Sequence, residues 1–193
     1  MCIRDSSERP SNDNCNYIIY SSHGLIVNQK KDLNIKSLPL KKIESFDEIS
    51  NNSLNIKEVF TESKYEFGMF DKHVSQNAII SFKEAVKDAS DRNIDVLITS
   101  PIDKNLSFSK NFKYSGHTDY LRNYFNEDPI MLMVSKKLKV GLLTEHIALK
   151  DVVHDITIEK IIKKLKLLSQ VLNKDFGIPV SYTHLRAHET SRN

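Results

Sequence analysis

The sequence predicts an α/β fold, because short β-rich apolar segments alternate with amphipathic helical segments over short connections. Residues 94–99, IDVLIT, are almost continuously apolar and β-branched, as in a strand buried on both faces of a parallel sheet. Two further apolar runs, 129–135 and 138–144, are separated only by a Lys-Lys pair, which predicts an antiparallel hairpin. We therefore expect a three-layer α/β/α arrangement around a mixed sheet.

The first half of the chain should contribute two short strands and one long helix. Residues 17–21 form a β-rich run, followed by a polar stretch that fits a weak helix or a loop. A second short strand is expected at 56–60. Apolar residues then recur at steps of three and four from 74 to 89, which predicts an amphipathic helix.

The second half should contain a polar loop and two more helices. Residues 101–116 are expected to form the loop, and 117–125 a short helix. The last helix is predicted at about 157–175, with Thr157 or Asp155 as its N-cap, and Gly177 followed by a proline marks its end.

Composition limits the classes of partner. The chain has 193 residues and a formal charge of +3, from 28 Lys and Arg against 25 Asp and Glu, which is too balanced to favour nucleic acid. No apolar run approaches the roughly 20 residues of a membrane helix. With 2 cysteines, no disulfide framework is expected. These features favour a cytoplasmic protein that binds neither membranes nor nucleic acid.

Both ends of the chain differ from its middle. Residues 180–190 and 1–6 resemble the peptides obtained when sequencing adapters are translated. We therefore expect residues 1–14 to be a non-native leader and residues 180–193 a non-native tail, and we exclude both from the fold prediction.

Two polar segments could bind an anion. Residues 99–104, TSPIDK, combine two hydroxyls, a rigid turn and a lysine, although a simple capped turn would explain them too. In residues 115–119, SGHTD, Gly116 allows a sharp turn into a helix. The free N–H groups of that helix could then face a phosphate or carboxylate together with His117 and Thr118. The alternative is that Ser115 or Thr118 caps the helix and His117 lies on the surface.

A third segment could bind a metal ion. His146 follows an apolar strand-like run, and a neutral imidazole at a strand end is a suitable ligand for a divalent cation. One histidine does not make a site, because a catalytic metal usually takes about three protein ligands. A hydrogen-bonded structural histidine is the alternative.

Taken in order, the segments ITSPIDK, SGHTDYL and LLTEHIALKDV resemble successive signatures of the 4-hydroxythreonine-4-phosphate dehydrogenase family. The resemblance implies a fold like that of isocitrate and isopropylmalate dehydrogenases. It also implies NAD or NADP as cofactor, a divalent metal (Zn, Mg or Co), a phosphorylated hydroxy amino acid as substrate, and a homodimer. His117 and Thr118 match the family's substrate-binding pair, and His146 matches the first of three metal-binding histidines.

The resemblance also implies what is missing. The family's first strand and glycine-containing loop should precede Tyr17, and its other metal ligands and much of its cofactor site should follow Pro179. We therefore expect residues 15–179 to be a partial dehydrogenase, with parts of both α/β lobes and incomplete at both ends, and we assign no catalytic or cofactor-binding residue. Two other functions stay open: a dehydrogenase of a four-carbon phosphorylated sugar acid, and a non-catalytic phosphate-binding module.

Overall fold

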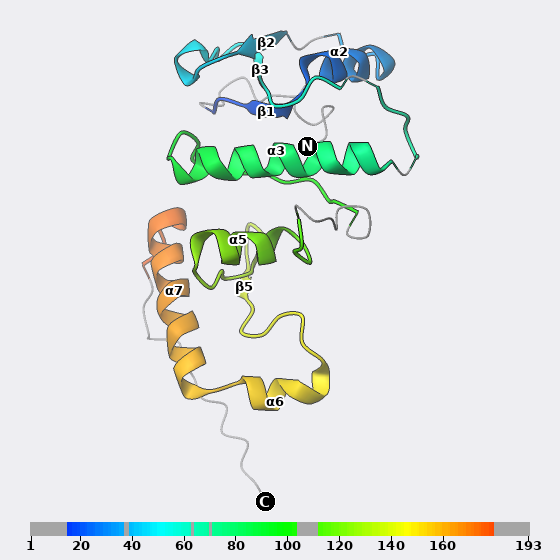
Figure 1. Cartoon of the computed structure of the whole chain (residues 1–193). Coiled ribbons are helices and arrows are strands. Elements are labelled where there is room, and N and C mark those ends of the chain that lie inside the picture. Colours follow the sequence, from blue (N-terminus) through cyan, green and yellow to red (C-terminus); the bar gives the residue numbers. More distant parts are fainter. Residues whose placement is uncertain (1–14, 37–38, 63, 70, 104–111, 180–193) are drawn as a thin grey trace, which may run out of the picture. The chain divides into compact units, whose positions relative to one another are not determined.

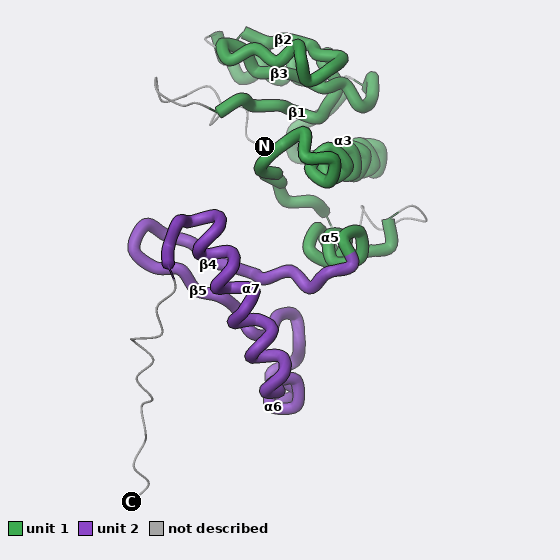
Figure 2. The backbone as a smooth tube through the Cα atoms, turned by 90° about the vertical axis from the view of Figure 1, so that its left-hand side faces the viewer, with its two compact units in different colours: residues 1–125 green, residues 126–193 purple. Residues whose placement is uncertain are grey.

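The computed structural model describes residues 15–36, 39–62, 64–69, 71–103 and 112–179. The chain divides into two compact units, residues 1–125 and 126–193 (Figure 2), and each unit is described by itself. The expected leader and tail lie outside the described residues, as does Lys104.

The first unit contains a three-stranded parallel sheet with the strand order β1-β3-β2. The strand predicted at 17–21 is confirmed, and the second predicted strand begins earlier than expected, at Leu54. Strand β2 was not predicted from the sequence, because Lys41 and Lys42 interrupt its apolar pattern. Charged side chains of this kind are typical of an edge strand. The strands are β1 (Ile18–Ser21), β2 (Leu40–Ile43) and β3 (Leu54–Glu58).

Two helices, α2 (His23–Asp32) and α3 (Lys72–Ser90), pack on opposite faces of this sheet (Figure 1). Successive strand residues point to opposite faces. Ile19 and Ile56 are neighbours across the β1–β3 pair and pack with Ile26 of α2. Tyr20 and Lys57, one residue further along each strand, reach α3 instead. The expected three-layer α/β/α arrangement is therefore present in this unit.

The contact between the sheet and α3 is polar. Asp88 of α3 is only 4% exposed, and its Oδ2 accepts hydrogen bonds from the Tyr20 hydroxyl at 2.7 Å and from Lys57 Nζ at 2.6 Å. Burial, together with the hydrogen bond to Asp88, raises the pKa of Tyr20 far above its ordinary value. One carboxylate thus joins two strands to the helix.

A second buried polar residue, Asn55 of β3, is fully satisfied. Its Nδ2 donates to the carbonyls of Tyr17 and Ser50, each at 3.1 Å, and its Oδ1 accepts from the Ser50 N–H at 2.9 Å. The side chain therefore fixes the start of β1 against the loop that leads into β3. That loop contains the short 3-10 helix η1 (Phe46–Glu48).

A separate apolar cluster joins α3 to α5 (His117–Phe125), the short helix predicted at 117–125. The long helix α3 is also confirmed, and it starts at the cap Asp71, whose side chain accepts from the His73 and Val74 N–H groups. The aromatic rings of α5 and of the chain before it pack on the face of α3 that the sequence marked as apolar. The cluster consists of Ile79, Phe82, Val86, Phe112 and Tyr120.

The expectation of a buried strand at 94–99 is wrong. These residues form no strand, and Val96 and Ile98 are 74% and 65% exposed, whereas Leu97 packs against the α3–α5 cluster. A strand needs a neighbour that accepts and donates its backbone hydrogen bonds. The described sheet ends at β1, and no described strand lies beside this run.

The second unit contains the predicted hairpin. Strands β4 (Leu132–Val134) and β5 (Lys139–Gly141) pair antiparallel, and the Ser135 N–H closes the turn on the Leu138 carbonyl at 2.8 Å. Parallel and antiparallel pairing therefore both occur, as expected for the α/β class, but within the described residues they occur in two separate sheets.

Three helical segments follow the hairpin: η2 (Leu149–Asp151), α6 (Val152–Asp155) and α7 (Ile158–Phe176). Thr157 caps α7, as predicted, through its side-chain oxygen and the Lys160 N–H. Gly177 ends the helix in the left-handed conformation, with φ of 62°, which a glycine adopts without steric cost. Asp155 pairs with the Lys160 ammonium instead of capping the helix. Within the described part of the chain, no helix is long and apolar enough to cross a membrane.

Replacing Asp88 should destabilise the first unit. We expect Asp88→Ala to lower the free energy of unfolding by about 1–3 kcal/mol, since it leaves the Tyr20 hydroxyl and a partly buried ammonium without their acceptor. Asp91→Ala is the matched control, because Asp91 is exposed at the end of the same helix, and it should change the value by less than about 0.5 kcal/mol. Urea unfolding measures both variants, and equal effects would contradict the assigned role of Asp88.

Candidate functional site

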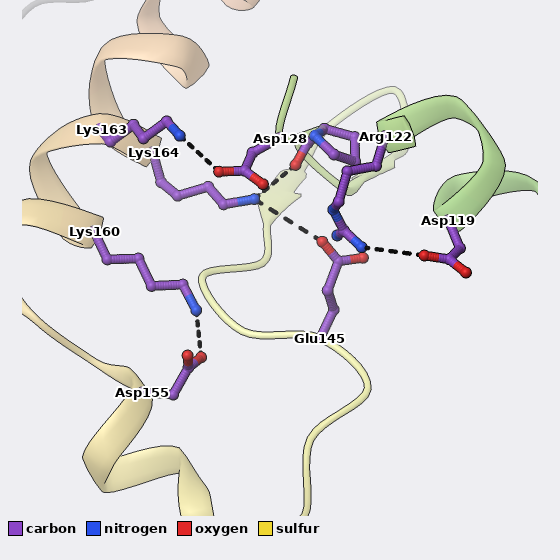
Figure 3. Close-up of polar contacts among 9 residues, drawn as sticks. Asp119, Arg122, Asp128, Glu145, Asp155, Lys160, Lys163 and Lys164 are labelled. Carbon is purple, nitrogen blue, oxygen red and sulfur yellow. Dashed lines mark hydrogen bonds and ion pairs between the residues drawn. The ribbon is translucent and has the colours of Figure 1, made fainter. Parts of the chain in front are cut away.

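The SGHTD segment forms the start of α5. The Gly116 carbonyl accepts the first helical hydrogen bond, from the Tyr120 N–H at 3.2 Å. Asp119 reaches back, and its Oδ2 accepts from the Ser115 N–H at 3.1 Å. Its other oxygen lies 3.9 Å from Arg122 (Figure 3). The cap that closes this helix start is therefore made by Asp119 and uses neither His117 nor Thr118.

His117 is half-buried rather than on the surface. Its ring meets the edge of Phe82 on α3, with the ring centroids 4.6 Å apart and the planes at 70°. Burial lowers the pKa of the imidazole. At neutral pH the ring is therefore uncharged, so that one nitrogen can donate a hydrogen bond while the other accepts one.

His117 lies at a cavity of about 700 Å³ in the first unit. Residues 99–102, which belong to the first predicted anion-binding segment, line the same cavity, and β1 and α3 supply other walls. The structure thus brings two of the three predicted segments together. The hydroxyls of Thr99 and Ser100 and the imidazole of His117 can offer hydrogen bonds to a polar ligand there. Thr118, one residue further along α5, is not among the residues that line it.

The third predicted segment lies in the second unit. His146 is exposed, and its φ of 56° places it in the left-handed region, which is uncommon for a residue with a side chain. Its neighbour Glu145 lies 3.9 Å from Lys164 of α7, and the two side chains are 12% and 13% exposed. Lys164 Nζ also donates to the Pro129 carbonyl at 2.6 Å (Figure 3). This lysine therefore fixes the chain just before His146.

The described residues do not form a metal site by themselves. No group of three or more His, Cys, Asp and Glu side chains that could hold an ion is present among them. His146 has Glu145 beside it in sequence, but that carboxylate is directed at Lys164. Any ion bound at His146 would need ligands from beyond the described residues.

Three residues that position the site were not predicted from the sequence. Asp119 gave no recognised capping signal, because it follows Ser115 by four residues, whereas a capping box places its Glu or Gln three residues after the serine or threonine. Phe82 was expected only as part of the apolar stripe of α3, and its contact with His117 joins distant parts of the sequence. Lys164 lies in a lysine-rich stretch that gives no sign of burial, and only the packing of α7 shows that its side chain is nearly buried.

The layered fold defines an α/β protein, and its first unit has a cavity at the start of α5. The model of the family described as "Pyridoxal phosphate biosynthetic protein PdxA" matches residues 13–183. The chain therefore belongs to this family.

Individual relatives agree with the family match. A 4-hydroxythreonine-4-phosphate dehydrogenase of Sulfurihydrogenibium is 36% identical over 166 residues, which cover 86% of this chain and 51% of the relative. The Aquifex aeolicus protein of the same name is 32% identical over 163 residues, covering 83% and 50%. A crystal structure of the Burkholderia phymatum protein of that name has a TM-score of 0.76 at 21% identity, over 89% of this chain and 53% of that one. The chain thus spans about half the length of these relatives.

The lowered pKa of His117 predicts a pH dependence of stability. The unfolded histidine titrates near pH 6.5, whereas the folded one stays neutral to lower pH. As the pH falls through this range, the unfolded state binds a proton first, so the contribution of His117 to stability is present above about pH 6.5 and is lost below it. Urea unfolding between about pH 7.5 and 5 should show this loss in the parent chain.

The variant His117→Gln should lose that part of the pH dependence. Thr118→Ala is the matched control, because it changes the next residue and removes no titratable group, and it should keep the parent profile. An NMR titration of the imidazole protons measures the pKa directly. A His117 pKa at or above the ordinary histidine value would contradict the effect of burial.

Proposed function

We propose that this chain is part of an NAD- or NADP-dependent dehydrogenase that oxidises the secondary hydroxyl of 4-phosphooxy-L-threonine. The β-keto acid so formed loses carbon dioxide to give 3-amino-2-oxopropyl phosphate, in the biosynthesis of pyridoxal 5'-phosphate. The observation that carries this proposal is the family match over residues 13–183. The relatives are named for this dehydrogenase, and the activity of a complete protein is inferred from them.

In this proposal His117 and Thr118 bind the substrate. The neutral imidazole of His117 donates a hydrogen bond to an anionic group of the substrate, and Phe82 holds the ring in place. The first N–H groups of α5 add partial positive charge at the same point, which favours a phosphate or a carboxylate. The Asp119 carboxylate accepts a hydrogen bond from the Ser115 N–H, and this contact fixes the backbone conformation at the start of α5.

We further propose His146 as one ligand of a divalent metal, Zn, Mg or Co, within a homodimeric enzyme. When bound, such an ion would polarise the substrate oxygen. Its remaining ligands, and the residues that bind NAD or NADP, would come from outside the described residues. The left-handed turn at His146, held by Glu145 and Lys164, supports the proposal that this residue has a role beyond packing.

Two other functions are distinguished by their ligands. A dehydrogenase of a four-carbon phosphorylated sugar acid would share the proposed phosphate contact. A phosphate-binding module would need only the first unit, because His117 and the cavity both belong to it. Neither alternative is favoured by the names of the relatives.

The first test concerns the metal. Zinc titration of the purified chain, followed by calorimetry, should reveal only weak binding, because a single imidazole from this chain cannot complete a site that usually takes about three protein ligands. His146→Ala should remove what binding there is, whereas His154→Ala, an exposed histidine in the same unit, should not. Submicromolar zinc affinity that depends on His146 would show that the chain forms a complete site.

The second test concerns the substrate. We expect 4-phosphooxy-L-threonine to shift the NMR signals of the His117 ring, and His117→Ala to weaken its binding by about tenfold, as for one lost hydrogen bond to a charged group. His154→Ala is the control and should bind like the parent chain. Equal binding by the His117 variant would remove this residue from the proposed site. Equal binding of inorganic phosphate and of the full substrate would favour a phosphate-binding module.

A further inference from the structure

Asp119 places a full negative charge at the start of α5. Its Oδ2 accepts hydrogen bonds from the Ser115 N–H at 3.1 Å and from the Ser115 hydroxyl at 3.4 Å, which hold the carboxylate there. The N–H groups at a helix start together carry about half a positive charge, and the neutral ring of His117 adds none. The carboxylate therefore opposes the binding of an anion at the point where the proposed substrate binds.

Arg122 lies close enough to this carboxylate to offset its charge. Its guanidinium Nη1 is 3.9 Å from Asp119 Oδ1 (Figure 3). That separation is too long for a hydrogen bond, and the two side chains are 41% and 43% exposed, so the pair should contribute little to stability. Its main effect is on the local charge, because a cation beside the carboxylate restores the positive potential that the N–H groups of α5 provide.

The position of Arg122 along α5 directs its side chain toward the same anion. Arg122 follows Thr118 by four residues, so the two lie on one face of the helix, one turn apart. Helical side chains lean toward the N-terminus, and the contact with Asp119, three residues earlier, shows this direction for Arg122. The planar guanidinium is thus displaced toward the helix start, and its N–H groups match two oxygens of a phosphate.

We propose that Arg122 is a further substrate-binding residue, whose guanidinium offsets the charge of Asp119 and binds the phosphate of a phosphorylated substrate. This inference rests on the proposed function, in which His117 and Thr118 bind that substrate. The imidazole supplies an uncharged donor, the helix start supplies its N–H groups, and Arg122 supplies a full positive charge. A phosphate dianion gains more from this charge than a singly charged carboxylate does.

Titration of the full chain with 4-phosphooxy-L-threonine, followed by the NMR signals of the His117 ring, tests the proposal. Arg122→Gln should weaken binding by about tenfold, because it removes the charge and the paired N–H donors. Arg122→Lys keeps the charge without the planar fork and should recover part of the affinity. Lys113→Gln is the matched control. It removes the same charge from an exposed lysine near the start of α5 and should change the affinity by less than about twofold.

A double-mutant cycle with Asp119 separates the effect of charge from a structural effect. Asp119→Asn removes the negative charge but keeps a side-chain oxygen that can accept from the Ser115 N–H. In that background Arg122→Gln should weaken binding by only about threefold, because no carboxylate is left to offset. An equal loss of affinity in both backgrounds would contradict the proposed compensation of charge.

The remaining outcomes separate this inference from the proposed function. Unchanged binding by Arg122→Gln, together with weaker binding by His117→Ala, would overturn the role of Arg122 alone. No response of the His117 signals in the parent chain would overturn both. Urea unfolding of Arg122→Gln should match that of the parent, since an exposed pair is lost. A loss of affinity that is matched by Lys113→Gln, or accompanied by a loss of stability, would also overturn the proposal.

Discussion

The carboxylate of Asp88 is the contact on which the first unit depends. It is the only acidic side chain in the buried part of the described structure, and it receives hydrogen bonds from β1 and from β3. Through it, the sheet fixes α3. The same helix presents Phe82, against which the ring of His117 rests. The position of the proposed substrate-binding imidazole thus depends on a polar contact that holds another part of the same helix.

The chemistry of the proposed site combines a neutral ring with a helix start. A protonated histidine would bind a phosphate more strongly, but it would also lose that charge within the physiological pH range. Burial against Phe82 keeps His117 neutral, so that its hydrogen bonding does not change near neutral pH. The positive potential comes instead from the N–H groups of α5, which carry no proton that titrates. Recognition of an anion at the proposed site would therefore depend less on the pH near neutrality.

The sequence predicted those parts of the fold that local patterns determine. Helices α3, α5 and α7 follow from apolar periodicity and from caps such as Thr157, and the β4–β5 hairpin follows from two apolar runs beside a two-residue turn. Strand pairing is not local, and so it was the source of error. Residues 94–99 have the composition of a buried strand, yet they form none, because no described strand pairs with them. Likewise, the contact of Phe82 with His117 could not be read from either segment alone.

The turn at His146 shows how a nearly buried ion pair can maintain an unfavourable backbone conformation. A left-handed residue with a side chain costs of order 1 kcal/mol or more, and it persists only where its surroundings hold it. Lys164 supplies that support, because it contacts both the Glu145 carboxylate and the Pro129 carbonyl, on either side of the β4–β5 hairpin. An exposed pair would contribute little at 3.9 Å, but these two side chains are largely shielded from water, which strengthens their attraction. The backbone conformation at His146, and with it the direction of its side chain, is thus set by the contact with α7. A fixed side-chain direction matters more for a metal ligand, the role proposed for His146, than for a surface histidine.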